Sequence, residues 1–246
     1  MGAVSALIWL GVWTALYFAV NREVLIASPL KVLFRLFEML GEKQLYIKAA
    51  NSLWAILKGY LSALLAGTAL AVLTSKSELM RAVFKPFMNV VRSTPVASFI
   101  ILALVWMTKK NVPVFTSFLM VMPIVWSNIS TGINSTDGLL LEMARAYRVP
   151  KRKIISKIYL PSVMPEIYNS VTTGLGFAWK SGVAAEVLST PVNTIGLELY
   201  NAKVYLETTD LFAWTAVIII MSMMLEKAAV YLLRRIFNKF SGGEIK

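Results

Sequence analysis

The chain has 246 residues, of which 57% are hydrophobic and 15% are charged, whereas a soluble domain is typically about 45–50% apolar and about 25% charged. This balance excludes an ordinary soluble domain and predicts a polytopic membrane protein. The net charge of +12 does not indicate a nucleic-acid partner, because the cations interrupt apolar segments instead of forming one basic domain. The chain has no cysteine and no histidine, which removes thiolate chemistry, the usual general base and the commonest metal ligand.

The first predicted element is a membrane span at residues 3–20, an apolar run without a charge. A cleaved signal peptide is the alternative, but no basic segment precedes the run and no clear cleavage site follows it, so we expect a retained helix. The next segment has Ser28 as a possible N-cap, Pro29 in the first turn and Gly41 after the last turn. Its apolar residues recur at helical spacing, which predicts an amphipathic helix at the membrane interface.

Five further apolar regions are predicted to cross the membrane: residues 50–74, 86–107, 112–131, 161–185 and 211–233. The first of them contains Gly59 and Gly67 among other small residues, which predicts close packing against a neighbouring helix. Residues 186–210 form a polar, glycine-containing connection. No long linker or repeat divides the chain, so we expect one all-α membrane domain, residues 1–246, with about six transmembrane helices.

The segment from Glu142 to Pro161 has no apolar run long enough to cross a bilayer, although it lies between two predicted spans. It holds six lysine or arginine residues against one acid. The residue before a proline is pushed away from the αR conformation, so the Val149–Pro150 step predicts two short helices with a break between them. A compact, basic, helical loop within residues 137–160 offers a surface that a partner protein can bind.

The charges of the loops predict the orientation of the chain. Lysine and arginine concentrate in three segments that six spans would place on the same side as the N-terminus: residues 76–92, 132–160 and 234–246. Residues 186–210, on the other side, hold one lysine and four acids. Because lysine and arginine are enriched in cytoplasmic loops, we expect the loop 137–160 and both termini to be cytoplasmic. Residues 21–48, with five cations on the outer side, argue weakly against this orientation.

The basic loop resembles the coupling loop of binding-protein-dependent ABC importer permeases, whose pattern is E-A-A, three residues, glycine, nine residues and I-x-L-P. The residues that match this spacing are Glu142, Ala144, Ile158, Leu160 and Pro161. Two residues depart from it: Met143 replaces an alanine, and Arg148 replaces the glycine. We expect Pro150 to supply the break that the glycine provides in relatives.

Three other motifs resemble the nitrate/sulfonate/taurine-type members of this family. Ser52-Leu53 followed by Gly59-Tyr60 is similar to their second-helix pattern, and Arg92-Ser93-Thr94-Pro95 is similar to their R-x-x-P entry to the next helix. The third motif, similar to their W…E…G segment after the coupling loop, consists of Trp179, Glu186 and Gly196. The landmarks follow the family's order over most of the chain.

The resemblance implies a type I ABC importer transmembrane domain with a cytoplasmic coupling helix, in a bacterial plasma membrane. In that family two permease copies form a pore, two cytoplasmic ATPases each grip one coupling helix, and an extracytoplasmic binding protein delivers the solute. The relatives imply a small anionic or polar organic solute. The chain has no G-x-x-x-x-G-K-[ST] phosphate loop, so we expect a partner subunit to hydrolyse ATP and this chain to bind no cofactor.

The residues predicted to couple to the ATPase are Glu142, Ala144, Arg145, Arg148, Pro150, Leu160 and Pro161. Ala144 is the expected position of close approach, because a small side chain lets another surface come near. Glu142 fits either a cap on its own helix or a contact with the ATPase. The loop cations fit either a partner or anionic lipid headgroups. Pro161 is expected to separate the second short helix from the fifth span.

The candidates for the solute path are Arg92, Ser93, Thr94, Trp179, Lys180 and Glu186. A charge inside a bilayer costs ~2.5–3.5 kcal/mol or more, which makes Lys180 and Arg92 candidates for a positive path. The alternatives are an ion pair of Lys180 with Glu186 or another acid, and extension of Arg92 to the cytoplasmic interface. Ser93 and Thr94 either touch solute or satisfy nearby backbone groups, and Trp179 fits either a gate or aromatic packing.

Two other classes of protein remain as alternatives. The energising transmembrane subunit of a vitamin-type ABC transporter also has Ala-Arg coupling motifs, which Ala144-Arg145-Ala146 partly matches, but the ordered landmarks argue against it. An intramembrane enzyme would have to use a carboxylate such as Glu166 or Glu186, because histidine, cysteine and G-x-S-x-G are all missing.

Overall fold

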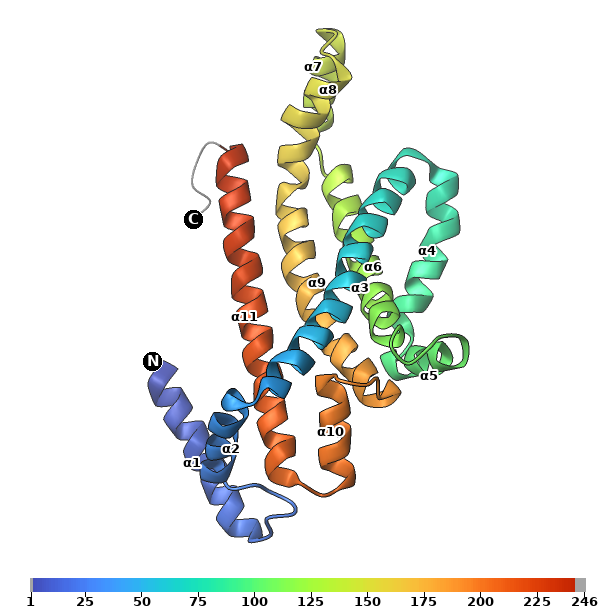
Figure 1. Cartoon of the computed structure of the whole chain (residues 1–246). Coiled ribbons are helices and arrows are strands. Elements are labelled where there is room, and N and C mark those ends of the chain that lie inside the picture. The colour runs from blue at the N-terminus through green and yellow to red at the C-terminus, as the bar shows by residue number, and fades with distance from the viewer. Residues whose placement is uncertain (1, 242–246) are drawn as a thin grey trace.

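The computed structural model describes residues 2–241, and every element of secondary structure in that range is a helix (Figure 1). The elements are α1 (Gly2–Val20), α2 (Pro29–Gly41), α3 (Lys43–Lys76), α4 (Glu78–Ser93), α5 (Val96–Trp106), α6 (Val112–Asn134), α7 (Gly138–Ala146), α8 (Lys151–Ile154), the π-helical turn η1 (Ile155–Tyr159), α9 (Leu160–Ser189), α10 (Ile195–Val204) and α11 (Thr208–Ser241). The predicted all-α class is confirmed. The last residues of the basic tail, 242–246, lie outside the described residues.

The number of membrane spans in the structure does not confirm the predicted six. Among the described residues, three helices are long and apolar enough to cross a bilayer: α3, α6 and the Thr208–Arg235 part of α11. A fourth span results if α4 and α5 are counted together. The apolar part of α1, Leu7–Val20, is shorter, and α9 has 30 residues but contains serines, threonines, Glu166 and Lys180 along its length.

The predicted third span, residues 86–107, is wrong as a single helix. α4 begins earlier, at Glu78, and α5 begins at Val96 with its axis turned by 105° from that of α4. Pro95 explains the break, because its ring disfavours the helical conformation at the residue before it. Thr94 is accordingly extended, with φ −84° and ψ 130°. The apolar run therefore bends sharply at Pro95 instead of forming one straight helix.

α3, α6 and α9 form the centre of the bundle (Figure 1) and supply most of the main cluster of buried hydrophobic side chains. The two glycines of α3 lie directly against α6. A Cβ atom on Gly59 would come within 2.2 Å of the Val114 carbonyl oxygen, and one on Gly67 within 2.8 Å of Val125 Cβ. The close packing predicted for this face of α3 is confirmed, and α6 is its partner.

The helix predicted after Ser28 is α2, and it is amphipathic. Two of its apolar side chains, Val32 and Met39, are buried against the bundle, while others on the helix are exposed. On its polar side, Arg35 forms an ion pair with Asp210 at the start of α11, with 2.8 Å between Nε and Oδ1. α2 is thus attached to α11 by both apolar and ionic contacts.

The connection 186–210 is more ordered than its polar sequence indicates, because it contains α10. Thr194 caps this helix by accepting the Leu197 N–H at 3.3 Å. Glu198 of α10 forms an ion pair with Lys48 of α3 at 2.8 Å, and both side chains are largely buried. The acids of this region therefore hold helices together at the end of the molecule away from α7 and α8.

Candidate functional site

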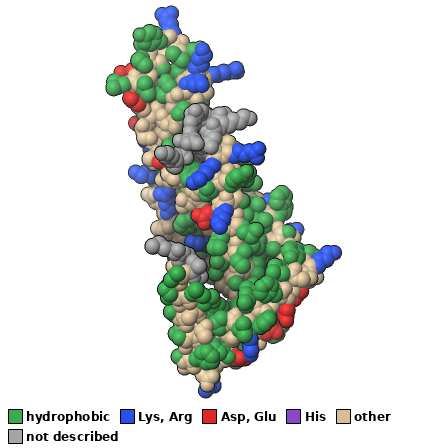
Figure 2. All heavy atoms as spheres, turned by 90° about the vertical axis from the view of Figure 1, so that its left-hand side faces the viewer, with side chains coloured by type: hydrophobic (Ala, Val, Ile, Leu, Met, Phe, Trp, Pro, Cys, Tyr) green, Lys and Arg blue, Asp and Glu red, His purple; other side chains and the backbone are tan. Residues whose placement is uncertain are grey.

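α7 and α8 form a projecting hairpin that extends beyond the rest of the bundle, at the top of Figure 1. The predicted break is confirmed, since α7 ends at Ala146 and α8 starts at Lys151. Lysine and arginine side chains gather on this tip (Figure 2). They include Arg145, Arg148, Lys151, Arg152 and Lys153, all exposed, and none of them forms an ion pair with another described residue.

Arg148 makes the turn of the projecting hairpin. Its φ is 53°, in the left-handed region that glycine adopts easily and other residues adopt rarely. The Val149 N–H donates to the Ala144 carbonyl at 2.9 Å, and the Arg148 N–H donates to the Arg145 carbonyl at 3.0 Å. This pair of bonds is the Schellman motif that ends many helices. The expectation that Pro150 replaces the glycine is wrong: Arg148 adopts the glycine-like conformation itself, and Pro150 follows the turn.

Asp137, not Glu142, caps α7. The Asp137 side chain accepts the Leu139 N–H at 2.8 Å, which satisfies one of the free donors of the first turn. Glu142 lies in the middle of the helix, is exposed, and its carboxylate has no partner among the described residues. The capping role proposed for Glu142 is therefore wrong, and its contact with a partner stays a prediction.

The open face of α7 differs from the one predicted. Ala144 is only 6% exposed and lies on the inside of the turn, so its expected role as the position of close approach is wrong. The most exposed large side chains are Leu139, Met143 and, at the C-cap position, Tyr147, which are 76%, 55% and 80% exposed. Their four-residue spacing places them on one side of the helix. The sequence contained this signal, because large apolar or aromatic residues repeat at that spacing inside a polar loop.

Pro161 does not separate the projecting hairpin from α9, contrary to the prediction. α8, η1 and α9 follow one another without a gap, and Pro161 lies in the first turn of α9. The Leu160 N–H bonds to the Ile155 carbonyl, five residues back, and the Ser162 hydroxyl donates to the Ile158 carbonyl at 2.8 Å. A wider π turn accommodates a proline ring that would otherwise clash with the preceding turn. The hairpin is therefore joined to α9 by continuous helix.

Trp179 and Glu186 face the interior of the single chain. Trp179 is 2% exposed, and its indole N–H donates to a backbone carbonyl of α11 at 3.2 Å, which is the packing role and not that of a gate. Glu186 is fully buried, and its Oε2 accepts the Ser52 hydroxyl at 2.8 Å and the Gly196 N–H at 3.1 Å. Ser52 also accepts the Ile195 N–H at 3.0 Å. Residues from two of the sequence motifs thus meet in one buried network that joins α3, α9 and α10.

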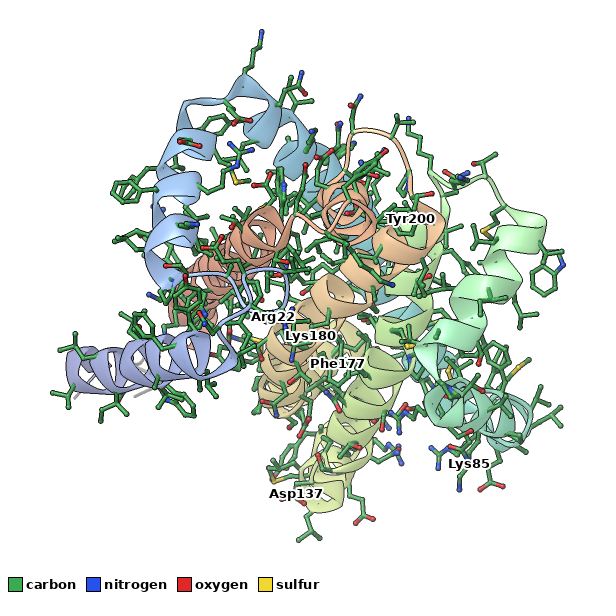
Figure 3. The ribbon with its side chains drawn as sticks, turned by 90° about the horizontal axis from the view of Figure 1, so that it is seen from below. Arg22, Lys85, Asp137, Phe177, Lys180 and Tyr200 are labelled. Atoms are coloured by element: carbon green, nitrogen blue, oxygen red, sulfur yellow. The ribbon has the colours of Figure 1, made fainter. Side chains whose placement is uncertain are left out.

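Lys180 lies on the open face of α9, beside Phe177 (Figure 3). Both side chains are exposed, and they are separated in space from Lys85 on α4 and Asp137 before α7. The predicted alternative, an ion pair between Lys180 and Glu186, is absent, and Lys180 has no ion-pair partner among the described residues. An unpaired cation is therefore presented on the outside of one chain.

Arg92, Ser93 and Thr94 lie at the bend between α4 and α5. The Arg92 guanidinium donates to the Pro123 carbonyl at 2.7 Å and so ties α4 to α6. The hydroxyls of Ser93 and Thr94 both donate to the Val90 carbonyl, at 3.2 and 2.8 Å, which is the backbone-satisfying role. The six path candidates thus do not form one cluster. Within residues 2–241, no group of three or more acidic, histidine or cysteine side chains could hold a metal ion.

Curated relatives match most of the chain. The taurine transport system permease protein TauC of Escherichia coli K12 is 24% identical over 243 residues, which cover 95% of this chain and 86% of the relative. The nitrate import permease protein NrtB of Leptolyngbya laminosa is 24% identical over 81% of this chain and 74% of the relative. A probable ABC transporter permease protein of Brucella melitensis is 26% identical over 92% of each chain.

Solved structures show the same fold. A crystal structure of an amino acid ABC transporter with histidines superposes with a TM-score of 0.63 at 16% identity, covering 76% of this chain and 92% of that chain. An inward-facing structure of the MetNI methionine ABC transporter superposes with a TM-score of 0.61 at 15% identity, covering 78% of this chain and 95% of that chain. Residues 63–240 match the family model of the binding-protein-dependent transport system inner membrane component. The chain therefore belongs to this family, as the permease subunit of an ABC importer of the nitrate/sulfonate/taurine type.

Proposed function

We propose that the projecting hairpin is the surface through which a cytoplasmic ATPase drives this permease. The observation that supports the proposal is the face of α7 formed by Leu139, Met143 and Tyr147, three large exposed side chains next to cations without ion pairs among the described residues. Exposed apolar groups with a charged rim are typical of protein–protein contacts. Family membership removes the two competing classes, the vitamin-type energising subunit and the intramembrane enzyme.

The connection of the hairpin to the bundle supports a mechanical role. The Schellman turn at Arg148 fixes α7 against α8, and continuous helix from Lys151 to Ser189 joins the tip to the centre of the membrane domain. A displacement of the tip by a closing ATPase is therefore passed to α9 as a movement of one stiff element. Glu142, Arg145 and Arg148 are exposed on this tip and are placed to contact the partner.

The charge of the tip supports a cytoplasmic position for the projecting hairpin and for the end of α11. Lysine and arginine dominate this end of the molecule (Figure 2), whereas Glu198, Glu207 and Asp210 lie at the other end. Cytoplasmic segments are enriched in lysine and arginine. In this orientation the binding protein delivers solute at the end that contains α10.

The open face of α9 supports assembly with a second copy of the chain. Asn169, Thr173 and Lys180 are all exposed on one side of this helix. Polar and charged groups facing lipid are costly, so this face requires protein or water beside it. Two copies that meet across a water-filled path along α9 provide both. We propose a homodimeric permease with two ATPases and one binding protein.

A small anionic solute fits this path. Lys180 places a positive charge on the α9 face, and no described acid neutralises it. Several relatives are permeases of taurine, nitrate and bicarbonate transport systems, whose names refer to small anions or zwitterions. We infer that the solute of this importer belongs to the same chemical class. Mass spectrometry of the solute held by the cognate binding protein identifies it directly.

The test of the coupling proposal is retention of the ATPase by variants of the hairpin. Met143→Glu combined with Tyr147→Glu should lower the amount of cognate ATPase that co-purifies about tenfold or more, because the change charges two central apolar contacts. Leu79→Glu is the matched control, since Leu79 is 71% exposed in the first turn of α4, outside the projecting hairpin. Undiminished ATPase retention and solute-stimulated hydrolysis in the double variant would exclude the hairpin as the docking surface.

A further inference from the structure

A cavity of about 780 Å³ opens between α3, the turn from α5 to α6 and the turn from α9 to α10. The elements that line it lie in the half of the molecule away from the projecting hairpin (Figure 1). Its volume is within the range of about 300–1,000 Å³ that is usual for sites of small ligands. No residue of the projecting hairpin lines it, and neither does Lys180. The cavity is therefore separate from the coupling surface and from the open face of α9.

Three lysines line this cavity: Lys58 of α3, and Lys109 and Lys110 of the turn before α6. None of them has an ion-pair partner among the described residues. Lys109 Nζ donates to Thr190 Oγ1 across the cavity at 3.2 Å, and Lys58 Nζ lies 5.1 Å from the centre of the Trp54 ring. Three cations without an ion-pair partner around one hollow create a positive potential that attracts an anion.

The start of α6 adds to this potential. Asn111, Pro113 and Val114 line the cavity, so the N-terminal end of this 23-residue helix borders it. The Asn111 side chain does not cap the helix. Free N–H groups and the positive end of the helix dipole favour an anion at such a position.

One wall of the cavity carries an acidic side chain instead of basic ones. Glu186 lines it, is 0% exposed, and has its Oε2 occupied by Ser52 and Gly196. Its other oxygen, Oε1, is buried without a hydrogen-bond partner among the described residues. A buried polar atom of this kind is stabilised by a donor that approaches it. A ligand with an N–H group supplies that donor.

The rim next to Glu186 is conformationally strained. Thr190 and Asn193 both have left-handed backbones, with φ of 50° and 57°. This conformation is unusual for a β-branched threonine. The Asn51 amide donates to the Asn193 carbonyl at 3.0 Å and helps to hold the turn in place. Strain that the surrounding structure maintains is found at ligand-binding sites more often than elsewhere.

We propose that this cavity binds a small organic anion that also has an ammonium or N–H group, such as an aminoalkyl sulfonate or an amino acid. The anionic end lies among Lys58, Lys109 and Lys110, and the donor approaches Glu186. The inference rests on the proposed function in one respect, namely that the importer carries a small anionic solute. It deepens that function by placing a first solute site at the end of the chain opposite the coupling hairpin, ahead of the α9 path.

The test uses the assembled transporter in lipid nanodiscs, without the binding protein, and two probes that differ by one ammonium group: taurine (2-aminoethanesulfonate) and ethanesulfonate. Equilibrium binding should be tighter for taurine. The double variant Lys58→Met, Lys109→Met should weaken the binding of both probes about tenfold, since it removes two charge-assisted contacts. Glu186→Gln should weaken taurine binding and leave ethanesulfonate binding unchanged, because only taurine has the donor.

Lys43→Met is the matched control, because Lys43 is an exposed lysine of the same helix that does not line the cavity. Retention of the ATPase and basal ATP hydrolysis, measured on the same samples, show whether each variant is assembled. Wild-type affinity in the assembled lysine double variant, or no binding of either probe by the wild type, would overturn the inference and leave the coupling proposal intact. Loss of the ATPase from the wild-type complex would instead refute the coupling proposal alone.

Discussion

The left-handed turn at Arg148 allows the effect of a single substitution to be worked out. A non-glycine residue in this conformation costs about 1–2 kcal/mol, because its Cβ atom crowds the following carbonyl oxygen. Glycine avoids that cost but loses about 0.4–1 kcal/mol more conformational entropy when the turn orders. Subtracting the midpoint of the second range from that of the first leaves about 0.8 kcal/mol in favour of glycine. This free energy corresponds to about a fourfold change in the equilibrium constant for opening of the turn. We therefore expect Arg148→Gly to stabilise the projecting hairpin.

Hydrogen exchange at the Val149 amide measures this effect, because its N–H is bonded to the Ala144 carbonyl only while the turn is closed. Arg148→Gly should slow exchange at Val149 about fourfold in the purified permease without the ATPase. Arg148→Ala is the control: it removes the exposed guanidinium but keeps the Cβ atom, so exchange should stay near the wild-type rate. Equal exchange rates in the glycine and alanine variants would show that backbone conformation does not limit this turn.

Two predictions concern the packing of the membrane domain. Gly59→Ala should lower the free energy of unfolding by about 1–3 kcal/mol, because its methyl group would lie 2.2 Å from the backbone of α6, whereas Gly11→Ala meets nothing within 4 Å. Thermal unfolding in detergent compares them, and equal midpoints would contradict this packing. Ser52→Ala should cost about 2 kcal/mol, since a buried N–H and the Glu186 carboxylate lose a partner, while Ser62→Ala on the exposed side of α3 should cost little. Similar losses in both serine variants would refute the role of the buried network.

Most of the helices could be predicted from the chain because long apolar runs have few alternatives in a membrane. The spans predicted at residues 50–74 and 112–131 lie inside α3 and α6. The prediction failed at residues 86–107, where hydropathy continues through Pro95 although the helix does not. It also missed α10, because a polar segment with a glycine gives no apolar period and its order comes from contacts with α3, α9 and α11.

The candidate site was predicted in position more accurately than in detail. Spacing located the projecting hairpin and its break, but the roles of Glu142, Ala144, Pro150 and Pro161 differ in the structure. These roles depend on which way a side chain points after one left-handed residue and one π turn, and neither feature has a reliable sequence signal. The exposed face of α7 was detectable from its four-residue spacing, since that spacing places side chains on one side of a helix.

Composition and motif order were enough to assign the class of protein, because the composition fits a bilayer and the order of the motifs fits one family. The sequence also located the basic loop, since six cations cannot lie in lipid. Folding of the whole chain, in contrast, is what joins Ser52, Glu186 and Gly196 in one buried network and places three lysines around one cavity. These residues are up to 144 positions apart in the chain, and helix packing, which depends on the shapes of many side chains together, brings them into contact.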